Sequence, residues 1–156
     1  MNIVLFGVGP HAKRIYLKYI QKVDFIDKVL IVDLKHRRKA IEEVVNKFDF
    51  DYELLLFDSV IRDDEVLSDV NRILLLQKIS DYDINHAIIS TEPKSHMMYI
   101  DFCLEVGLSI MCDKPITASI GSNTEFGSQK LLDDYYKIVK KYRQSNSKRF
   151  DVMAQR

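Results

Sequence analysis

The stretch Ile3-Val4-Leu5-Phe6-Gly7-Val8-Gly9-Pro10-His11-Ala12 decides the fold of this chain. A short apolar run, a turn of the form G-x-G-x-x-A and the start of a helical pattern are typical of the first strand, turn and helix of a dinucleotide-binding fold. Gly7 permits the tight turn, Gly9 lets the backbone approach a pyrophosphate, and Ala12 stands where only close helix–strand packing is needed. The sequence therefore predicts a phosphate-binding turn here.

The first residues of the helix fit the same interpretation. Pro10 suits the first helical position, because its missing N–H group would have no partner there. The helix N-terminus then offers free N–H groups and a positive dipole to phosphates. His11 is a candidate contact for cofactor or substrate, and a solvated histidine in the first helical turn is an equal alternative.

Beyond this turn, short apolar runs alternate with stretches of helical periodicity. The runs predict strands at residues 3–6, 29–32, 54–57, 87–89, 108–112 and 150–154. The periodicity predicts helices at residues 10–22, 37–48, 64–82, 95–106 and 131–142, with Ser95 as an N-cap, Gly107 as a left-handed C-terminal residue and the last helix covering the sheet. Residues 117–128 are rich in Gly and Ser and are expected to be irregular.

Continuous apolar runs separated by helices indicate parallel strands that are covered on both faces. We therefore expect one α/β domain over residues 1–156. Its predicted architecture is a doubly wound, mostly parallel six-stranded Rossmann sheet in the order 3-2-1-4-5-6, with helices on both faces.

An acidic residue follows the second predicted strand. Asp33 lies about 20 residues after the glycine turn, the spacing at which an acidic side chain binds the ribose hydroxyls of NAD. Helix capping is the alternative for Asp33. The basic segment 35–39, which includes Arg37, would suit the 2′-phosphate of NADP or form a solvated first helical turn. Because Asp33 would repel that phosphate, the sequence favours NAD and leaves NADP open.

A second turn follows the fourth predicted strand, at residues 90–96. Pro93 forces the chain out of the strand direction. Ligands of open α/β sheets bind outside the carboxyl ends of the strands, where the strand order reverses, so Ser90, Thr91 and Pro93 are candidate cofactor contacts. His96 is a further candidate, and packing against the sheet is its alternative role.

The fifth predicted strand ends in Asp113-Lys114-Pro115. A lysine that comes just after a buried strand and is itself followed by a proline lies at the ligand-binding edge of such a sheet. Lys114 is therefore a candidate for a charged group in the site, and Asp113 and Pro115 are candidate cofactor contacts beside it. An ordinary loop lysine is the alternative.

The composition argues against several classes of protein. The 23 basic and 23 acidic residues give a net charge of +0, which offers no argument for a nucleic-acid partner or an anionic membrane surface. No apolar run reaches about 18 residues, so no membrane span is predicted. Cys103 and Cys112 have neither metal-ligand nor disulfide-framework spacing, and no metal site is expected. Reduced cysteines favour a cytoplasmic location.

Three elements of this chain together resemble the Gfo/Idh/MocA oxidoreductases. The elements are the glycine turn, then Thr91 and Pro93 with His96, then Asp113-Lys114-Pro115. The family patterns are a Gly-rich turn, a T-P-N-x-x-H-like loop and an E-K-P strand end. Here Glu92 separates Thr91 from Pro93, and Asp113 stands in place of the usual Glu while keeping its charge.

The resemblance implies a nicotinamide cofactor, NAD or NADP, and hydride transfer to or from an alcohol or carbonyl. The substrate would be a small molecule, often a sugar or cyclitol. Lys114 would be the catalytic residue, which hydrogen-bonds the reacting oxygen and the nicotinamide ribose of the cofactor and stabilises a developing alkoxide. The cofactor itself would carry the hydride chemistry.

Members of that family are longer than this chain. They carry a second α/β domain that supplies substrate contacts and a histidine acid/base. We therefore expect residues 1–156 to be the cofactor domain of a longer two-domain enzyme, inactive alone, with homo-oligomers forming through the second domain.

Two other classes of function share part of this pattern. A non-catalytic nucleotide-sensing module would use Gly7, Gly9 and Asp33 but would not need Lys114. A methyltransferase-like fold also has a Gly-rich first turn and an acid after the second strand. The Asp113-Lys114-Pro115 strand end has no role in that fold, so we rank it last.

Overall fold

In the computed structural model, six parallel strands form one sheet within the described residues, which are 1–58, 66–118, 121 and 123–153. The strands are β1 (Asn2–Phe6), β2 (Lys28–Leu34), β3 (Tyr52–Phe57), β4 (Ile84–Ile89), β5 (Ser109–Asp113) and β6 (Phe150–Met153). Their order, β3-β2-β1-β4-β5-β6, confirms the predicted topology.

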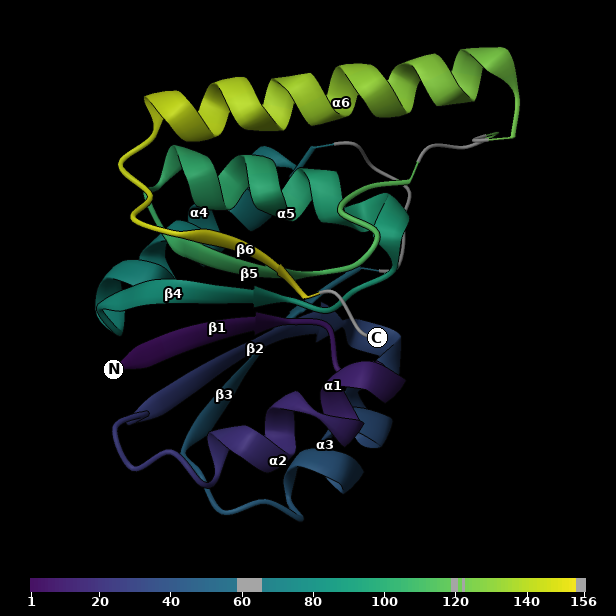
Figure 1. Ribbon diagram of the computed structural model, residues 1–156. Helices are drawn as coiled ribbons and strands as arrows, with labels where there is room; N and C mark the ends of the chain where they lie inside the picture. The colour runs from purple at the N-terminus through teal and green to yellow at the C-terminus, as the bar shows by residue number, and fades with distance from the viewer. Residues whose placement is uncertain (59–65, 119–120, 122, 154–156) are drawn as a thin grey trace.

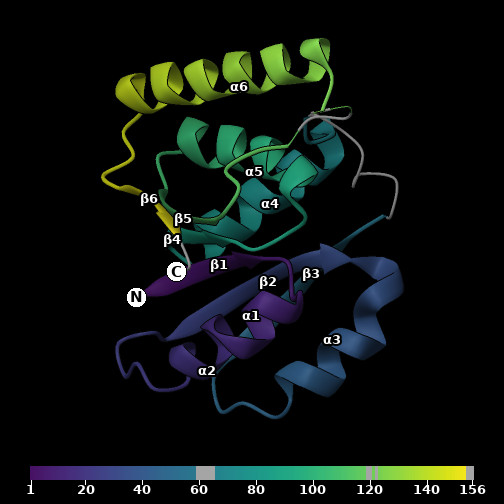
Figure 2. The ribbon, with the colours of Figure 1, turned by 45° about the vertical axis from the view of Figure 1, so that its right-hand side comes forward.

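Helices cover both faces of this sheet (Figures 1 and 2). The helices are α1 (Pro10–Arg14), α2 (Tyr16–Ile20), α3 (Arg38–Val45), α4 (Asp69–Asp81), α5 (Pro93–Glu105) and α6 (Glu125–Gln144), with a 3-10 turn, η1 (Lys35–Arg37). Helices α1, α2 and α3 lie on one face, and α4 and α5 lie on the other (Figure 2). No helix among the described residues is long and apolar enough to cross a membrane.

Strand β1 shows why a continuous apolar run forms the centre of the sheet. Successive side chains of a strand point to opposite faces. Ile3 and Leu5 accordingly join the core under α1 to α3, whereas Val4 and Phe6 join the core under α4 and α5. All four are nearly or fully buried. Burial of an aliphatic or aromatic side chain contributes about 1.5–3 kcal/mol, so both faces stabilise the strand.

The register brings the carboxyl ends of the central strands to one edge. Phe6 pairs with Val32 of β2 and with Ile89 of β4. Just beyond them, the Gly7 N–H donates to the Val32 carbonyl at 2.8 Å, and the Ser90 N–H donates to the Phe6 carbonyl at 2.8 Å. The strand order reverses between β1 and β4, so a crevice is expected at this edge.

The prediction of a single helix over residues 10–22 was wrong. The structure has two short helices, α1 and α2, that are separated at Ile15, where φ is −110° and ψ is −71°. These angles lie away from ideal helical values, and β-branched residues such as isoleucine are stiff in a helix. The predicted helix 37–48 is likewise divided into η1 and α3.

Several helix boundaries also differ from those predicted. Helix α6 begins at Glu125 rather than 131, because the Thr124 hydroxyl accepts the Gly127 N–H at 3.1 Å and caps it, so the predicted irregular segment ends early. Helix α5 begins at Pro93, and Ser95 lies inside its first turn rather than capping it. Gly107, at φ +78°, follows α5 as predicted.

Two further differences concern α4 and the packing of α6, and the prediction for the last residue of β6 is not tested. Helix α4 begins at Asp69, capped by Ser68; residues 64 and 65 of the predicted helix lie outside the described residues. The last residue of the predicted sixth strand, Ala154, also lies outside them. Helix α6 packs on α5, farther from the sheet, rather than covering the sheet directly (Figures 1 and 2).

Candidate functional site

A cavity of about 570 Å³ opens at the carboxyl edge of the sheet, where the strand order reverses. This volume lies within the range of small-molecule sites. The lining residues are Gly7, Gly9, Pro10, His11, Asp33, Leu34, His36, Arg37, Ser90, Thr91, Glu92, Pro93, Ser95, Tyr99, Asp113, Lys114 and Met153. The cavity therefore unites the glycine turn, the acidic end of β2, and the turns after β4 and β5.

Three predicted site residues are not among those that line this cavity. Ala12 is fully buried in the core beneath α1. His96 is fully buried behind the turn that follows β4. Pro115 follows Lys114 and presents its carbonyl oxygen to His96. These residues support the walls of the cavity from outside it.

Six lining residues were not singled out from the sequence as ligand contacts: Leu34, His36, Glu92, Ser95, Tyr99 and Met153. Four of them, Leu34, His36, Glu92 and Ser95, are directly adjacent in sequence to a predicted contact, so proximity in sequence could have found them. Tyr99 lies within α5, where its ring packs on Phe6 with 4.4 Å between centroids. No local motif marks Tyr99 or Met153, because each reaches the cavity only through the fold.

The two glycines of the first turn have different structural roles. Gly7 has φ +87°, and a Cβ on it would lie 2.8 Å from the Ser90 carbonyl oxygen. Both facts require glycine there. Gly9 has φ −80°, and a Cβ on it would meet only the Ser90 oxygen, at 3.7 Å. Space beside the Gly9 backbone is therefore open to a ligand.

The carboxylate of Asp33 is buried and fully engaged. Its Oδ2 accepts the Val8 N–H at 2.8 Å, and its Oδ1 accepts the Leu34 N–H at 2.8 Å. Arg37 donates from Nη1 to both oxygens at 2.9 Å and from Nη2 to the Val8 carbonyl at 2.8 Å. The helix-capping alternative is not observed, since no side chain caps η1 or α3.

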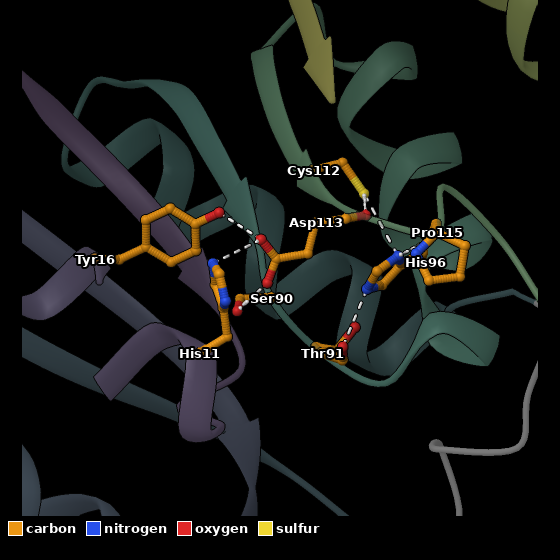
Figure 3. A network of polar contacts seen from close by, with 8 residues as sticks. All are labelled: His11, Tyr16, Ser90, Thr91, His96, Cys112, Asp113 and Pro115. Carbon is orange, nitrogen blue, oxygen red and sulfur yellow. Dashed lines mark hydrogen bonds and ion pairs between the residues drawn. The ribbon is translucent and has the colours of Figure 1, made fainter. Parts of the chain in front are cut away.

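Asp113 gathers three side chains from separate elements (Figure 3). Its Oδ2 accepts the Ser90 hydroxyl at 2.6 Å, and its Oδ1 accepts the hydroxyl of Tyr16. The Nε2 atom of His11 lies 3.5 Å from the same Oδ1. Burial and the Asp113 carboxylate both raise the pKa of Tyr16, which keeps that phenol protonated as a donor. His11 therefore lines the cavity in contact with an acidic partner.

His96 packs in the interior rather than lining the cavity (Figure 3). Its Nδ1 lies 2.9 Å from the Pro115 carbonyl oxygen, and its Nε2 lies 3.0 Å from that of Thr91. Burial lowers the pKa of His96, and these two carbonyl contacts offset only part of that effect. The ring joins the turns after β4 and β5 and thus fixes two walls of the cavity.

Lys114 is exposed at the cavity, directly after Asp113. Within the described part of the chain its ammonium has no hydrogen-bond or ion-pair partner. Most other polar groups in the cavity wall are already held by neighbours, as Asp33, Arg37 and Ser90 are. Lys114 is therefore a cation that a ligand could engage without breaking an internal contact.

The donor set of this cavity fits a dinucleotide. The open backbone at Gly9 and the first residues of α1 suit a pyrophosphate. Apolar surfaces of Pro10, Leu34 and Met153 could contact rings. Among the described residues, no group of three or more His, Cys, Asp and Glu side chains could hold a metal ion.

Comparison with known proteins supports this assignment. The model of the Gfo/Idh/MocA family, described as "Oxidoreductase family, NAD-binding Rossmann fold", matches residues 1–128. No protein with curated annotation matches the sequence.

Solved structures share the fold at low sequence identity. A Gfo/Idh/MocA family oxidoreductase from Vibrio cholerae has a TM-score of 0.67 and 14% identity, over 98% of this chain and 38% of its own. A 3-ketoreductase from Actinomadura kijaniata, in complex with NADP and TDP-benzene, has a TM-score of 0.56 and 14% identity, over 92% and 34%. An aldose-aldose oxidoreductase from Caulobacter crescentus has a TM-score of 0.56 and 14% identity, over 94% and 36%.

This chain thus spans little more than a third of the length of these solved structures. The family model covers most of the chain and includes all three motifs that meet at the cavity. The chain belongs to the Gfo/Idh/MocA oxidoreductase family and is an NAD-binding domain with a Rossmann fold.

Proposed function

We propose that residues 1–156 form one dinucleotide-binding domain of an enzyme that interconverts an alcohol and a carbonyl. A small sugar- or cyclitol-like molecule is the substrate. The name of the aldose-aldose oxidoreductase indicates a sugar for that protein, and the name of the 3-ketoreductase indicates a keto group for that one. The observation that carries the proposal is Lys114, an exposed cation beside the glycine turn in the same cavity.

The residues of the cavity divide the binding of NAD(P) between them. The backbone of Gly7 and Gly9, with Pro10 and His11 at the start of α1, binds the pyrophosphate. The Asp33–Arg37 pair faces the adenosine ribose. Ser90, Thr91 and Pro93 after β4, with Asp113 and Lys114 after β5, surround the nicotinamide half; Ala12, His96 and Pro115 support these turns from outside the cavity.

When bound, the nicotinamide supplies or accepts the hydride. Lys114 acts on the substrate: its ammonium donates a hydrogen bond to the reacting oxygen and stabilises the negative charge that develops there. Asp113 orients this end of the site, because the donors Tyr16 and Ser90 fix its carboxylate directly before Lys114. The neutral Tyr16 remains a donor throughout, since burial and Asp113 raise its pKa.

Cofactor binding is the property that we expect this chain to show alone, because it spans little more than a third of its solved relatives. The test is a fluorescence titration of the chain with NADH and with NADPH. We expect saturable binding with enhanced nicotinamide emission for at least one of them. If neither binds, the proposal is wrong, and binding of S-adenosylmethionine instead would favour a methyltransferase-like function.

A further inference from the structure

The Asp33 carboxylate has no acceptor capacity left for a ribose hydroxyl. A carboxylate offers about four lone-pair positions for hydrogen bonds. The backbone N–H groups of Val8 and Leu34 and two contacts from Arg37 Nη1 occupy them, all at 2.8 to 2.9 Å. A ribose diol that used Asp33 as its acceptor would have to displace a donor that is already in place.

Arg37 also changes the charge at this end of the cavity. The Asp33 side chain is 3% exposed and that of Arg37 is 32% exposed, so Arg37 is the more accessible member of the pair in the cavity wall. At a contact of 2.9 Å the positive charge offsets the carboxylate. The repulsion that an isolated Asp33 would exert on a phosphate is therefore removed.

The guanidinium is anchored and still has donors to spare. Nη1 serves Asp33, and Nη2 donates to the Val8 carbonyl at 2.8 Å. Among the residues that the structure describes, the second Nη2 N–H and the Nε N–H of Arg37 have no partner. An anchored guanidinium with N–H donors still available suits a phosphate, and little entropy is lost on binding because its position is already fixed.

Neighbouring cations are held elsewhere, which singles out Arg37. Lys35 pairs with Asp58 at 2.8 Å, and Arg38 pairs with Glu42 at 3.1 Å. Neither lines the cavity, whereas Arg37 does. His36 lines the cavity beside Arg37 and offers a further polar contact.

We infer that the Asp33–Arg37 pair makes this domain selective for a cofactor that carries a 2′-phosphate, so that NADPH binds more tightly than NADH. Arg37 contacts the phosphate while it remains anchored on Asp33 and Val8. This inference rests on the proposed function, since it assigns the selectivity of the same site.

The experiment measures dissociation constants of NADH and NADPH for the native chain, Arg37→Gln and Arg38→Gln. Arg38→Gln is a matched control, because it removes the same charge one residue away and outside the cavity. In Arg37→Gln we expect NADPH binding to weaken about 10- to 100-fold, the loss of one charge-assisted contact. NADH binding should stay unchanged or tighten, because Asp33 regains free acceptors. Arg38→Gln should change the ratio of the two constants less than about twofold.

Adenosine-side fragments test the native chain without any substitution. Displacement of bound NADPH by 2′,5′-ADP should need a lower concentration than displacement by ADP. Should Arg37→Gln fail to fold, Arg37→Lys is the second variant. It keeps the charge but replaces the planar set of guanidinium N–H donors with a single ammonium, and we expect it to weaken NADPH binding more than NADH binding.

The possible outcomes separate this inference from the proposed function. Equal affinities or tighter NADH binding in the native chain would overturn the selectivity and leave the proposed function intact. An equal loss of both cofactors in Arg37→Gln, or no advantage of 2′,5′-ADP over ADP, would also overturn it. Failure to bind either dinucleotide would overturn both statements.

Discussion

The phenolic hydroxyl of Tyr16, at the start of α2, donates a hydrogen bond to the carboxylate of Asp113, 97 residues later at the end of β5. This contact joins the helix pair that follows the glycine turn to the strand end that precedes Lys114 (Figure 3). The break at Ile15 separates Tyr16 from α1. The contact thus ties the helices after the glycine turn to the wall of the cavity that carries Asp113 and Lys114.

Tyr16→Phe removes this donor while keeping the ring in the core. A hydrogen bond to a charged group contributes about 1.5–3 kcal/mol, and we expect the free energy of unfolding to fall by about that amount. Urea unfolding followed by circular dichroism measures it. Tyr19→Phe is the matched control, because Tyr19 lies on the same helix but is 64% exposed. Its effect should stay within about 0.5 kcal/mol. Equal effects of the two substitutions would show that the Asp113 contact contributes nothing.

The fold was predictable because its strands are largely continuous apolar runs. Such runs are typical of parallel strands that are buried on both faces of a sheet. Helix ends were less predictable, because their caps use residues that are also common in loops. Thr124 caps α6 in a stretch rich in Gly and Ser, where composition alone indicates irregular structure. The physical signal was a single hydroxyl and its partner N–H, which periodicity does not detect.

The site was predictable where motifs directly follow strands, and less so where residues meet through the fold. Asp33 and Arg37 were both identified, yet as competing signals for NAD and NADP. Their union in one ion pair depends on the 3-10 turn η1, which brings Arg37 back over the carboxylate. Tyr16 contacts Asp113, and Tyr99 lines the cavity, only because α2 and α5 pack near the ends of the strands. No spacing in the sequence therefore marks either tyrosine as a site residue.

Gly7→Ala and Gly9→Ala should separate stability from binding. At Gly7 the new Cβ meets the Ser90 carbonyl oxygen at 2.8 Å at a positive φ, so we expect a loss of about 2–4 kcal/mol in the free energy of unfolding. At Gly9 the nearest atom is 3.7 Å away at a permitted φ, so stability should stay the same or rise by up to about 1 kcal/mol.

Cofactor titration completes this comparison. The Cβ of Gly9→Ala would occupy the space that the pyrophosphate needs, so we expect about tenfold weaker binding in a stably folded protein. Unaltered affinity in Gly9→Ala would contradict the phosphate-binding role of this turn.

Acid should destabilise the protein through His96. Burial lowers the pKa of the folded His96 below the value of about 6.5 in an unfolded chain. The unfolded state therefore binds more protons as the pH falls, so the contribution of His96 is complete above about pH 6.5 and declines below it. We expect the free energy of unfolding to be smaller at about pH 5 than at about pH 7.5, and His96→Gln to reduce this difference.

An independent measurement and a control complete the test of His96. In an NMR titration the His96 ring should become protonated only below about pH 6.5, the value in an unfolded chain. His36→Gln is the control for replacing a histidine at an exposed position, because His36 is an exposed residue of η1. A His96 ring that becomes protonated above about pH 6.5 would reverse the sign of its contribution and contradict the prediction.

In the enzyme of which we propose this chain to be one domain, Lys114→Ala should leave cofactor affinity nearly unchanged and abolish most turnover. The ammonium has no partner among the described residues, so its removal breaks no internal contact, and we expect the free energy of unfolding to change by less than about 0.5 kcal/mol. The dissociation constant of the preferred dinucleotide should change less than about threefold, since the turn at Gly7 and Gly9 and the ribose end at Arg37 remain. Loss of a group that stabilises developing charge on the reacting oxygen lowers turnover by about 100-fold or more.

Lys94→Ala provides the comparison, because Lys94 is also a lysine next to a proline after a strand but does not line the cavity. It should alter neither binding nor turnover. Single-turnover mixing of the enzyme with bound reduced cofactor and a carbonyl substrate measures the chemical step directly, since oxidation of the nicotinamide is followed by its own absorbance. Binding and chemistry separate only if Lys114 acts on the substrate oxygen. If Lys114→Ala instead weakened cofactor binding as strongly as it slowed the chemical step, the lysine would act only as a cofactor ligand, and the stabilisation of the developing alkoxide would have to come from another residue.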